Sequence, residues 1–377
     1  MNTPAWPLPP RIPIAGRPRC SFQVFGLAGL VAGVAMASVA GWRSGLSPAA
    51  MGLLATLAFL TFAGLALATK AIAGEERLVY YHHEIAILLA LWAALVSLGL
   101  PVAPYLDAAV AGLGSFLFFG RIGCSSVGCC YGRPARWGWR YGREHVAAGF
   151  AAALQGVPIA PVQWIEAAGV FAITTFATVS IWRDAPAGTA LSLYLGGYAA
   201  LRFGLEYWRG DPARRRVRAW TEAQWTSIGV LGVVLWNIQP WLVVVPAVAA
   251  VAGLRARRET DWLEAAHVIE IAAALRDVSS DGGPDVRRTS RGLRISKAAL
   301  PCGSRLYALS SDVGSLPEPA VTSLVRLIAL IENLRPETAR IIRVNRGVVS
   351  LVFSASEEPL RGRAMEYQGV SAGRIPA

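Results

Sequence analysis

Long apolar stretches, separated by short polar ones, dominate the first two thirds of the chain. A helix of about 20 apolar residues is long enough to cross the hydrocarbon core of a bilayer. Seven stretches come close to that length: Phe22–Trp42, Pro48–Thr69, Ile85–Leu100, Ala103–Phe119, Val162–Trp182, Thr189–Trp208 and Gln224–Ala252. The last is long enough to contain a break at Pro240 or Pro246. The pattern predicts an all-α polytopic membrane protein with about seven transmembrane helices over residues 22–254, after an N-terminal segment of residues 1–21.

The first apolar stretch also has features of a secretory signal peptide. Basic residues precede its apolar core, and the small residues Ala37–Ala40 follow it. The apolar character resumes almost at once, at Pro48, and this favours a first spanning helix over a cleaved leader.

From Arg255 onwards the sequence becomes charged and polar. Two segments have the apolar spacing of helices, Thr260–Leu275 and Pro319–Leu334, while Arg340–Phe353 has the pattern of two short strands about a turn at Asn345–Gly347. The polar segment Ser279–Gly292 is typical of disorder. We predict a separate soluble α+β appendage over residues 255–377, on the cytoplasmic side. Its sequence indicates no particular chemistry.

Composition supports a membrane protein. Mean hydropathy is +0.44 and 16% of the residues are charged, whereas about a quarter are charged in soluble domains. The net charge is +12, and only Lys70 and Lys297 are lysines, so nearly all positive charge is guanidinium. A positive surplus at a membrane surface favours anionic lipid headgroups. The sequence has no nucleic-acid module with interleaved aromatic residues, so we expect no nucleic-acid partner.

The segment Gly120–Arg133, GRIGCSSVGCCYGR, follows directly on an apolar run. An arginine is among the costliest side chains to place near a bilayer core, so Arg121 and Arg133 are candidates for an anion site. The alternative is that they mark a helix end and extend to the headgroup region. The polar, glycine-rich residues 121–160 are expected to form a loop that folds over the membrane surface.

Two later spans also carry charges. Glu166 lies inside an apolar stretch, where a carboxylate by default marks a functional or paired site. In the next stretch Arg202, Glu206 and Arg209 are spaced by four and three residues, so they share one helix face. Pairing for stability alone is the competing interpretation. The loop Arg209–Trp220 contains five arginines, which form either a solvated face or a contact with phosphate.

The five cysteines are Cys20, Cys124, Cys129, Cys130 and Cys302. Their odd number argues against a disulfide framework. The pattern C-x4-C-C lacks the second ligand pair of a structural zinc or iron–sulfur site, so we expect no metal. Thiol redox chemistry at Cys129 and Cys130 is a further alternative. It is disfavoured because vicinal cysteines form strained disulfides and the chain has no C-x-x-C.

The order of these motifs resembles the prolipoprotein diacylglyceryl transferases. That family has a GRIGN-type signature ending in YGR or WGR, then a P-x-Q-x-Y-E-like segment, then an RF-x-x-E-x-x-R helix. This chain has GRIGCSSVGCCYGR, PVQWIE and RFGLEYWR in that order, followed by TEAQW where the family has an S-Q segment. The resemblance covers roughly residues 22–253.

The resemblance implies a bacterial inner-membrane enzyme without cofactor. It would move the diacylglyceryl group of phosphatidylglycerol onto the thiol of a lipobox cysteine in the signal peptide of a prolipoprotein, and glycerol phosphate would leave. Guanidinium groups suit the phosphate, and a base is needed to raise the thiolate fraction of the acceptor. The implied active site faces the extracytoplasmic side. This orientation conflicts with the positive-inside rule unless the loop arginines bind lipid phosphate.

Matched residue by residue, the resemblance implies that Arg121 and Arg202 hold the headgroup phosphate, with Glu166 and Glu206 orienting them. The remaining matched substrate-binding positions are Gly123, Gly128, Gly132, Arg133 and Arg209.

The family also carries a histidine at the start of its third span. His82, in the segment Tyr80–Ile85, matches it best and is the candidate base. The glycines that accompany the family's histidine are missing here, so an interfacial polar cap is the competing interpretation.

The chain departs from the family at further positions, and two of them, Val127 and Cys129, stand where some members have polar side chains. Phe25-Gly26 stands where the family has Tyr-Gly, and Cys124 replaces the asparagine after GRIG. These changes retain the phosphate-binding frame and remove polar groups around it. A non-catalytic lipid-binding or scaffolding paralogue is therefore the alternative function.

Overall fold

The computed structural model describes residues 7–73, 80–212, 216–255, 262–278, 285–300, 303–344 and 347–354. The chain forms two compact units, Met1–Ala266 and His267–Ala377. Each is described by itself below. The predicted start of a separate tail at Arg255 stays a prediction.

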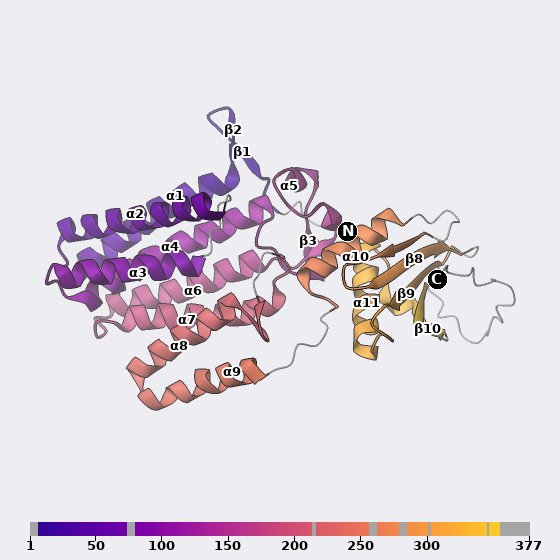
Figure 1. The fold of residues 1–377 in the computed structure, drawn as a ribbon. Coiled ribbons are helices and arrows are strands. Elements are labelled where there is room, and N and C mark those ends of the chain that lie inside the picture. The colour runs from indigo at the N-terminus through magenta and orange to yellow at the C-terminus, as the bar shows by residue number, and fades with distance from the viewer. Residues whose placement is uncertain are drawn as a thin grey trace. The chain divides into compact units, whose positions relative to one another are not determined.

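The first unit is helical (Figure 1). Its main helices are α1 (Ser21–Arg43), α2 (Pro48–Ala73), α3 (Tyr80–Ser97), α4 (Val102–Val127), α6 (Val162–Trp182), α7 (Thr189–Leu205), α8 (Glu222–Ile238) and α9 (Val244–Arg255). Among the described residues α1, α2, α4 and α6 are long and apolar enough to cross a membrane. A mostly helical membrane protein is confirmed, whereas the expected number of seven spans is not.

The last predicted span is divided into two helices. α8 ends at Ile238, a 3-10 turn covers Pro240–Val243, and α9 begins at Val244. Proline has no N–H to donate to the preceding turn, so Pro240 cannot continue α8. The predicted break at Pro240 is therefore confirmed. Pro246 lies in the first turn of α9, where a proline is tolerated.

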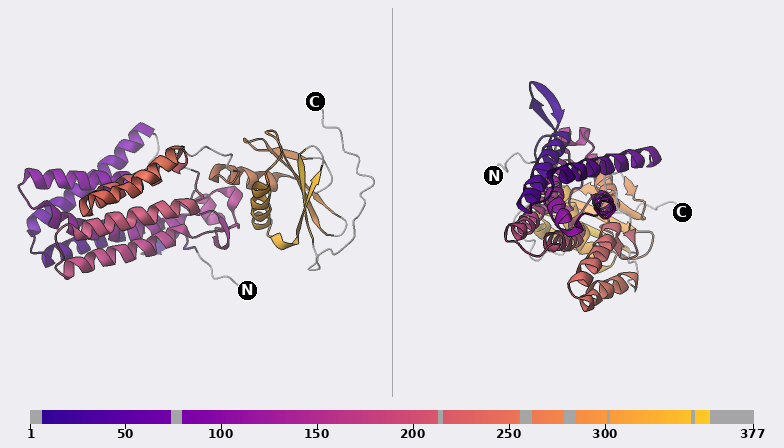
Figure 2. Two further views of the ribbon diagram at one scale, coloured as in Figure 1. Left: turned by 90° about the horizontal axis from the view of Figure 1, so that it is seen from below. Right: turned by 90° about the vertical axis from the view of Figure 1, so that its left-hand side faces the viewer.

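α4 is the central helix of this unit. It packs against α1, α3, α6 and α7, and half of its most apolar window is buried, against 22% for α1 and 11% for α2. α1 and α4 cross where Gly33 meets Gly112: a Cβ on Gly112 would lie 2.7 Å from the Gly33 carbonyl oxygen. Small residues at a crossing let two membrane helices approach closely. Figure 2 shows this helical unit from below and from one end.

Short strands join the helices. β1 (Arg11–Ile14) and β2 (Arg17–Cys20) form a hairpin before α1, β3 (Pro134–Arg140) pairs with β4 (Pro158–Ile159), and β5 (Arg216–Val217) pairs with β6 (Trp220–Thr221). A short helix, α5 (Arg143–Ala147), and a 3-10 turn, Ala152–Leu154, lie between β3 and β4. The expectation of a loop from residue 121 onwards was wrong at its start, because α4 continues to Val127.

The second unit is a five-stranded antiparallel sheet with two helices. In chain order it contains α10 (Ala265–Asp277), β7 (Val286–Arg288), β8 (Leu293–Ala299), β9 (Arg305–Ser311), α11 (Glu318–Ile331), the 3-10 turn Pro336–Thr338, β10 (Ala339–Val344) and β11 (Val348–Phe353). The strand order is β10-β11-β9-β8-β7. Alternate residues of β8, β9 and β11 are buried, as are the apolar positions of α10 and α11.

The α+β class of this unit is confirmed, as are its two helices and its last hairpin. Three strands were not predicted. One of them, Val286–Arg288, lies in the segment expected to be disordered, whose residues 279–284 are outside the described part. β7 has three exposed residues, so it has no apolar alternation to detect. The turn residues 345–346 and Cys302 also lie outside the described residues.

Candidate active site

The signature GRIGCSSVGCCYGR begins as helix and ends as an extended segment. Arg121 lies in the buried interior of α4, two turns before the helix end. Gly128 closes the helix in the left-handed conformation (φ 72°), and its N–H donates to the Cys124 carbonyl oxygen. A glycine at this position is the common end of a helix, because other residues are strained there. Arg121 is thus held by α4 itself rather than by a surface loop.

The end of the signature pairs with the end of the RF-x-x-E-x-x-R segment. Arg133 N–H donates to the Trp208 carbonyl oxygen at 2.8 Å, and Gly210 N–H donates to the Tyr131 carbonyl oxygen at 2.9 Å. Between them Gly132 and Arg209 form an isolated antiparallel bridge. A Cβ on Gly132 would collide with the Ala160 carbonyl oxygen. Only glycine fits here, and its absence of a side chain lets the two motif ends meet.

Three arginines converge on one fully buried carboxylate. Glu166, in the first turns of α6, is 0% exposed. Its Oε1 lies 3.0 Å from Arg121 Nη2 and 3.8 Å from Arg202 Nε, and its Oε2 lies 3.4 Å from Arg209 Nη1. The Tyr198 hydroxyl donates to Oε1 at 3.0 Å. Residues from α4, α6, α7 and the segment after α7 therefore form one ion cluster, and we call Arg121, Glu166, Arg202 and Arg209 the arginine cluster.

Two further carboxylates support the cluster. Arg202 Nη2 lies 2.6 Å from Glu206 Oε1, so the predicted pair four residues apart is present. The Thr221 hydroxyl donates to Glu206 Oε2 at 3.1 Å. Arg209 Nε donates to Asp211 Oδ1 at 3.0 Å. Burial raises the pKa of the Asp211 carboxyl above its ordinary value, and the charge of Arg209 opposes that rise.

Each arginine of the cluster keeps one nitrogen that lacks a hydrogen-bond partner among the described residues. These buried atoms are Arg121 Nε, Arg202 Nη1 and Arg209 Nη2. A buried donor left unsatisfied costs about 1–3 kcal/mol, and more when it is charged. Guanidinium groups bind phosphate oxygens in pairs, so the chemistry of these donors suits a phosphate.

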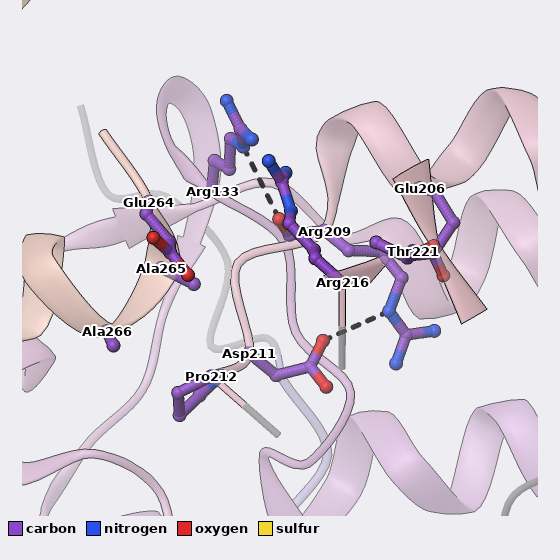
Figure 3. A pocket seen from close by; sticks show the side chains of 10 residues that line it. All are labelled: Arg133, Glu206, Arg209, Asp211, Pro212, Arg216, Thr221, Glu264, Ala265 and Ala266. Atoms are coloured by element: carbon purple, nitrogen blue, oxygen red, sulfur yellow. Dashed lines mark hydrogen bonds and ion pairs between the residues drawn. The ribbon is translucent and has the colours of Figure 1, made fainter. Parts of the chain in front are cut away.

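A hollow lies beside the cluster, at the loops that carry Arg133 and Arg209. Figure 3 shows both side chains there with Glu206, Asp211, Arg216 and Thr221. Arg133 Nε donates to the Arg209 carbonyl oxygen at 3.4 Å. Arg209 therefore belongs to the arginine cluster and also lines this hollow.

Comparison with known proteins bears on the same segment. Residues 75–238, which contain every predicted site residue, match the family model described as prolipoprotein diacylglyceryl transferase. The resemblance inferred from the motifs is confirmed. The match ends before the second unit, so it says nothing of the tail.

Three curated relatives, each named as such a transferase, match part of the chain. Phosphatidylglycerol–prolipoprotein diacylglyceryl transferase 2 of Clostridium perfringens is 36% identical over 134 residues, 35% of this chain and 50% of that protein. The Clostridium tetani transferase is 30% identical over 139 residues, 36% and 54% of the two chains. A Dehalococcoides mccartyi transferase is 34% identical over 104 residues, 28% and 39%. The alignments thus span about half of the relatives' length or less.

His82, the candidate base of the transferase resemblance, does not join the arginine cluster. It lies at the start of α3 with 48% of its side chain exposed, and its Nε2 is 2.7 Å from Glu222 Oε1 at the start of α8. The residue before Glu222 is Thr221, whose hydroxyl binds Glu206. His82 is therefore linked to Arg202 of the cluster through three residues, Glu222, Thr221 and Glu206. The adjacent His83 is buried and packs against Phe62.

The remaining signature positions have packing roles. A Cβ on Gly123 would lie 3.2 Å from Phe25 Cβ, so the phenylalanine that replaces the family's tyrosine packs directly on the signature. Gly128 lies beneath Phe150 and Tyr141. These positions let aromatic rings approach the signature closely, and they offer no side chain to a substrate.

Sequence reasoning missed several buried polar residues near the cluster. Tyr194, Tyr198 and Arg202 follow one another at intervals of four, which places them on one face of α7. The Tyr194 hydroxyl hydrogen-bonds the Tyr80 hydroxyl at 2.7 Å, and Glu84 is buried in α3. The sequence interpretation of an interfacial polar cap included Glu84, and the burial of Glu84 and His83 does not agree with it.

Proposed function

We propose that this chain transfers the diacylglyceryl group of phosphatidylglycerol to the thiol of a lipobox cysteine in a prolipoprotein. The names of the curated relatives support this substrate pair. The observation that carries the proposal is the arginine cluster, in which three buried guanidinium groups surround Glu166 and each retains an unsatisfied nitrogen.

In the proposed reaction, the thiolate sulfur attacks the glyceryl carbon that is esterified to phosphate. The carbon–oxygen bond breaks, its electron pair stays on the phosphate oxygen, and glycerol phosphate leaves. Negative charge therefore grows on the phosphate during the step. Arg121 and Arg202 hold that phosphate, and the carboxylates of Glu166 and Glu206 fix the orientation of the guanidinium planes. Donors fixed in advance in a site of low dielectric stabilise developing charge strongly.

The proton of the acceptor thiol passes to His82 in this proposal. An imidazole that is oriented by a carboxylate is a common arrangement for activating a nucleophile. Glu222, 2.7 Å from His82 Nε2, supplies that carboxylate. The half-exposed position of His82 leaves room for an incoming peptide, because the acceptor cysteine belongs to another chain.

The membrane arrangement is part of the proposal. We place the chain in the bacterial inner membrane with seven spans, α1, α2, α3, α4, α6, α7 and α8, and with the active site on the extracytoplasmic side. α3 has 18 residues and α7 with its 3-10 extension has 20, which at about 1.5 Å per residue gives roughly 27–30 Å, near the thickness of the hydrocarbon core.

The test is transfer of a radiolabelled diacylglyceryl group from phosphatidylglycerol to a lipobox peptide by membranes that contain the protein. We expect labelled peptide with the wild type and none with Arg121→Ala or Arg202→Ala. A Lys70→Ala variant, which removes an exposed cation in the last turn of α2, serves as the matched control. A folded wild-type preparation that labels no peptide contradicts the proposal.

A second function has its own support. Phe25 lacks the hydroxyl of the family's tyrosine, and His82 lies outside the arginine cluster. Both observations suit a non-catalytic lipid-binding or scaffolding paralogue. Complementation of a strain depleted of its own transferase separates the two proposals. Rescue of growth by the wild type, but not by Arg121→Ala, excludes the scaffold.

A further inference from the structure

Three cysteine thiols meet at the point where α4 ends. Cys124 lies in the last turn of the helix, and the turn at Gly128 brings Cys129 and Cys130 back towards it. All three sulfur atoms lie within 4.8 Å of one another. The sequence spacing alone argued against a metal site, because it offers no second pair of ligands. The left-handed turn changes that conclusion, because it gathers three ligands from seven consecutive residues.

The separation of the sulfurs suits one metal ion. A zinc–sulfur bond is about 2.3 Å long, so in a tetrahedral site the sulfurs lie about 3.8 Å apart. The cluster therefore needs to contract by at most about 1 Å, which side-chain rotation supplies. The three cysteines are free thiols in the structure, so all three are available as ligands. Thiolates select soft or borderline ions over magnesium and calcium.

Two nearby arginines reduce the cost of the negative charge that the proposed site would carry. Three thiolates and one divalent ion together carry a single negative charge. The positive charges of Arg209 and Arg121 act on the Cys130 sulfur, and they offset that excess. A buried group of thiolates without such neighbours would carry a large desolvation cost.

A buried amide side chain contacts the backbone of one of the three cysteines. Gln163 is 0% exposed, and its Nε2 donates to the Cys129 carbonyl oxygen at 2.8 Å and to the Tyr141 hydroxyl at 3.1 Å. Its Oε1 has no hydrogen-bond partner in the described part of the chain. Zinc sites with three protein ligands keep a fourth position for water or substrate. A water in that position would be a hydrogen-bond donor, and the Gln163 oxygen is a buried acceptor that the described residues leave unsatisfied.

We propose that Cys124, Cys129 and Cys130 form a binding site for one thiophilic divalent ion of the zinc class. The ion ties the end of α4 to the segment that carries Arg133, so it stabilises the frame next to the arginine cluster. Binding replaces the thiol protons by the metal, with no change of oxidation state. The site is independent of whether the chain transfers a diacylglyceryl group.

The experiment uses the full chain, purified in detergent with reductant and chelator and then titrated with Cd²⁺ or Zn²⁺. Cadmium thiolates absorb in the ultraviolet by charge transfer, so stoichiometry is read directly. We expect one Cd²⁺ per chain, a raised unfolding temperature with Zn²⁺, and protection of the three cysteines from alkylation. Cys124→Ser, Cys129→Ser and Cys130→Ser should each weaken binding at least about 100-fold, which exceeds the loss of an outer-shell partner.

Cys20→Ser is the matched control, because Cys20 ends β2 and is not part of the group of three. It should leave the affinity unchanged. Three results overturn the proposal: reduced wild type that takes up no Cd²⁺, an affinity for Cd²⁺ that Cys130→Ser leaves unchanged, or alkylation of Cys124 that Cd²⁺ does not slow. The alkylation measurement needs no variant, so it tests whether Cd²⁺ binds the three cysteines even where a serine variant fails to fold.

Discussion

Replacement of Glu166 by glutamine tests the arginine cluster most directly. The substitution keeps the shape of the side chain and removes its charge. Glu166 faces three guanidinium groups, at 3.0, 3.4 and 3.8 Å, and accepts a hydrogen bond from Tyr198. The glutamine amide offers only one acceptor oxygen, and its NH₂ group points donors at a cluster that already consists of donors. Glu166→Gln therefore leaves buried positive charge without compensation.

The size of the effect follows from burial. Removal of one partner of a buried ion pair costs about 3–5 kcal/mol. Arg202 and Arg209 keep the carboxylates of Glu206 and Asp211, whereas Arg121 has no second carboxylate in the described part of the chain. The main effect of the substitution should therefore be that Arg121 is no longer held in place. If that cost appears in the transfer step, the rate falls roughly 10²- to 5 × 10³-fold, since about 1.36 kcal/mol corresponds to tenfold.

The assay is the initial rate of transfer from labelled phosphatidylglycerol to a lipobox peptide, measured with the unfolding temperature of the same preparation. Asp184→Asn is the matched carboxylate-to-amide control. Its carboxylate is 73% exposed and pairs with Arg43 at 2.7 Å, and exposed pairs contribute little, so the rate should stay within about twofold of the wild type. A stable Glu166→Gln protein with a wild-type rate would refute the role of Glu166 in holding Arg121.

Three further predictions follow from other parts of the structure. Glu222→Gln should lower the transfer rate about tenfold at unchanged KM, because it loosens the orientation of His82 without touching the lipid site; steady-state kinetics with varied lipid measure this. Gly132→Ala should destabilise the chain by about 3 kcal/mol or more through its collision with the Ala160 carbonyl oxygen, whereas Gly204→Ala, in open space within α7, should be neutral or slightly stabilising; detergent thermal unfolding compares them. Leu309→Ala, at a fully buried position of β9, should destabilise the second unit by about 2–5 kcal/mol and leave the transfer rate unchanged. Hydrogen exchange measures the first effect and the transfer assay measures the second.

The membrane helices that could be predicted are those with few buried residues or with only one buried face. α1, α2 and α6 present much apolar surface, so hydropathy alone marks them to within a few residues. α4 is different, because it lies in the middle of the bundle and tolerates Arg121 and the serines after it. An apolar run therefore gives only part of this helix, and its true end depends on neighbours that supply ion pairs. Strands of the second unit were not predicted for a related reason. β7 has only exposed residues, so its sequence has no apolar pattern, and it forms a strand because it pairs with β8.

The sequence was enough to predict which residues form the site, but not which of them contact one another. Arg121, Glu166, Arg202 and Arg209 were singled out because charge is expensive in an apolar span, and the structure brings these four together. Nothing in the spacing of the motifs indicates that Glu166 is the common partner of three arginines, or that Glu222 lies against His82. Both depend on α6 and α8 packing against helices far away in sequence. The cysteines show the same limit most clearly, since C-x4-C-C has too few ligands along the sequence, and the left-handed turn at Gly128 is what brings the three thiols to a single point.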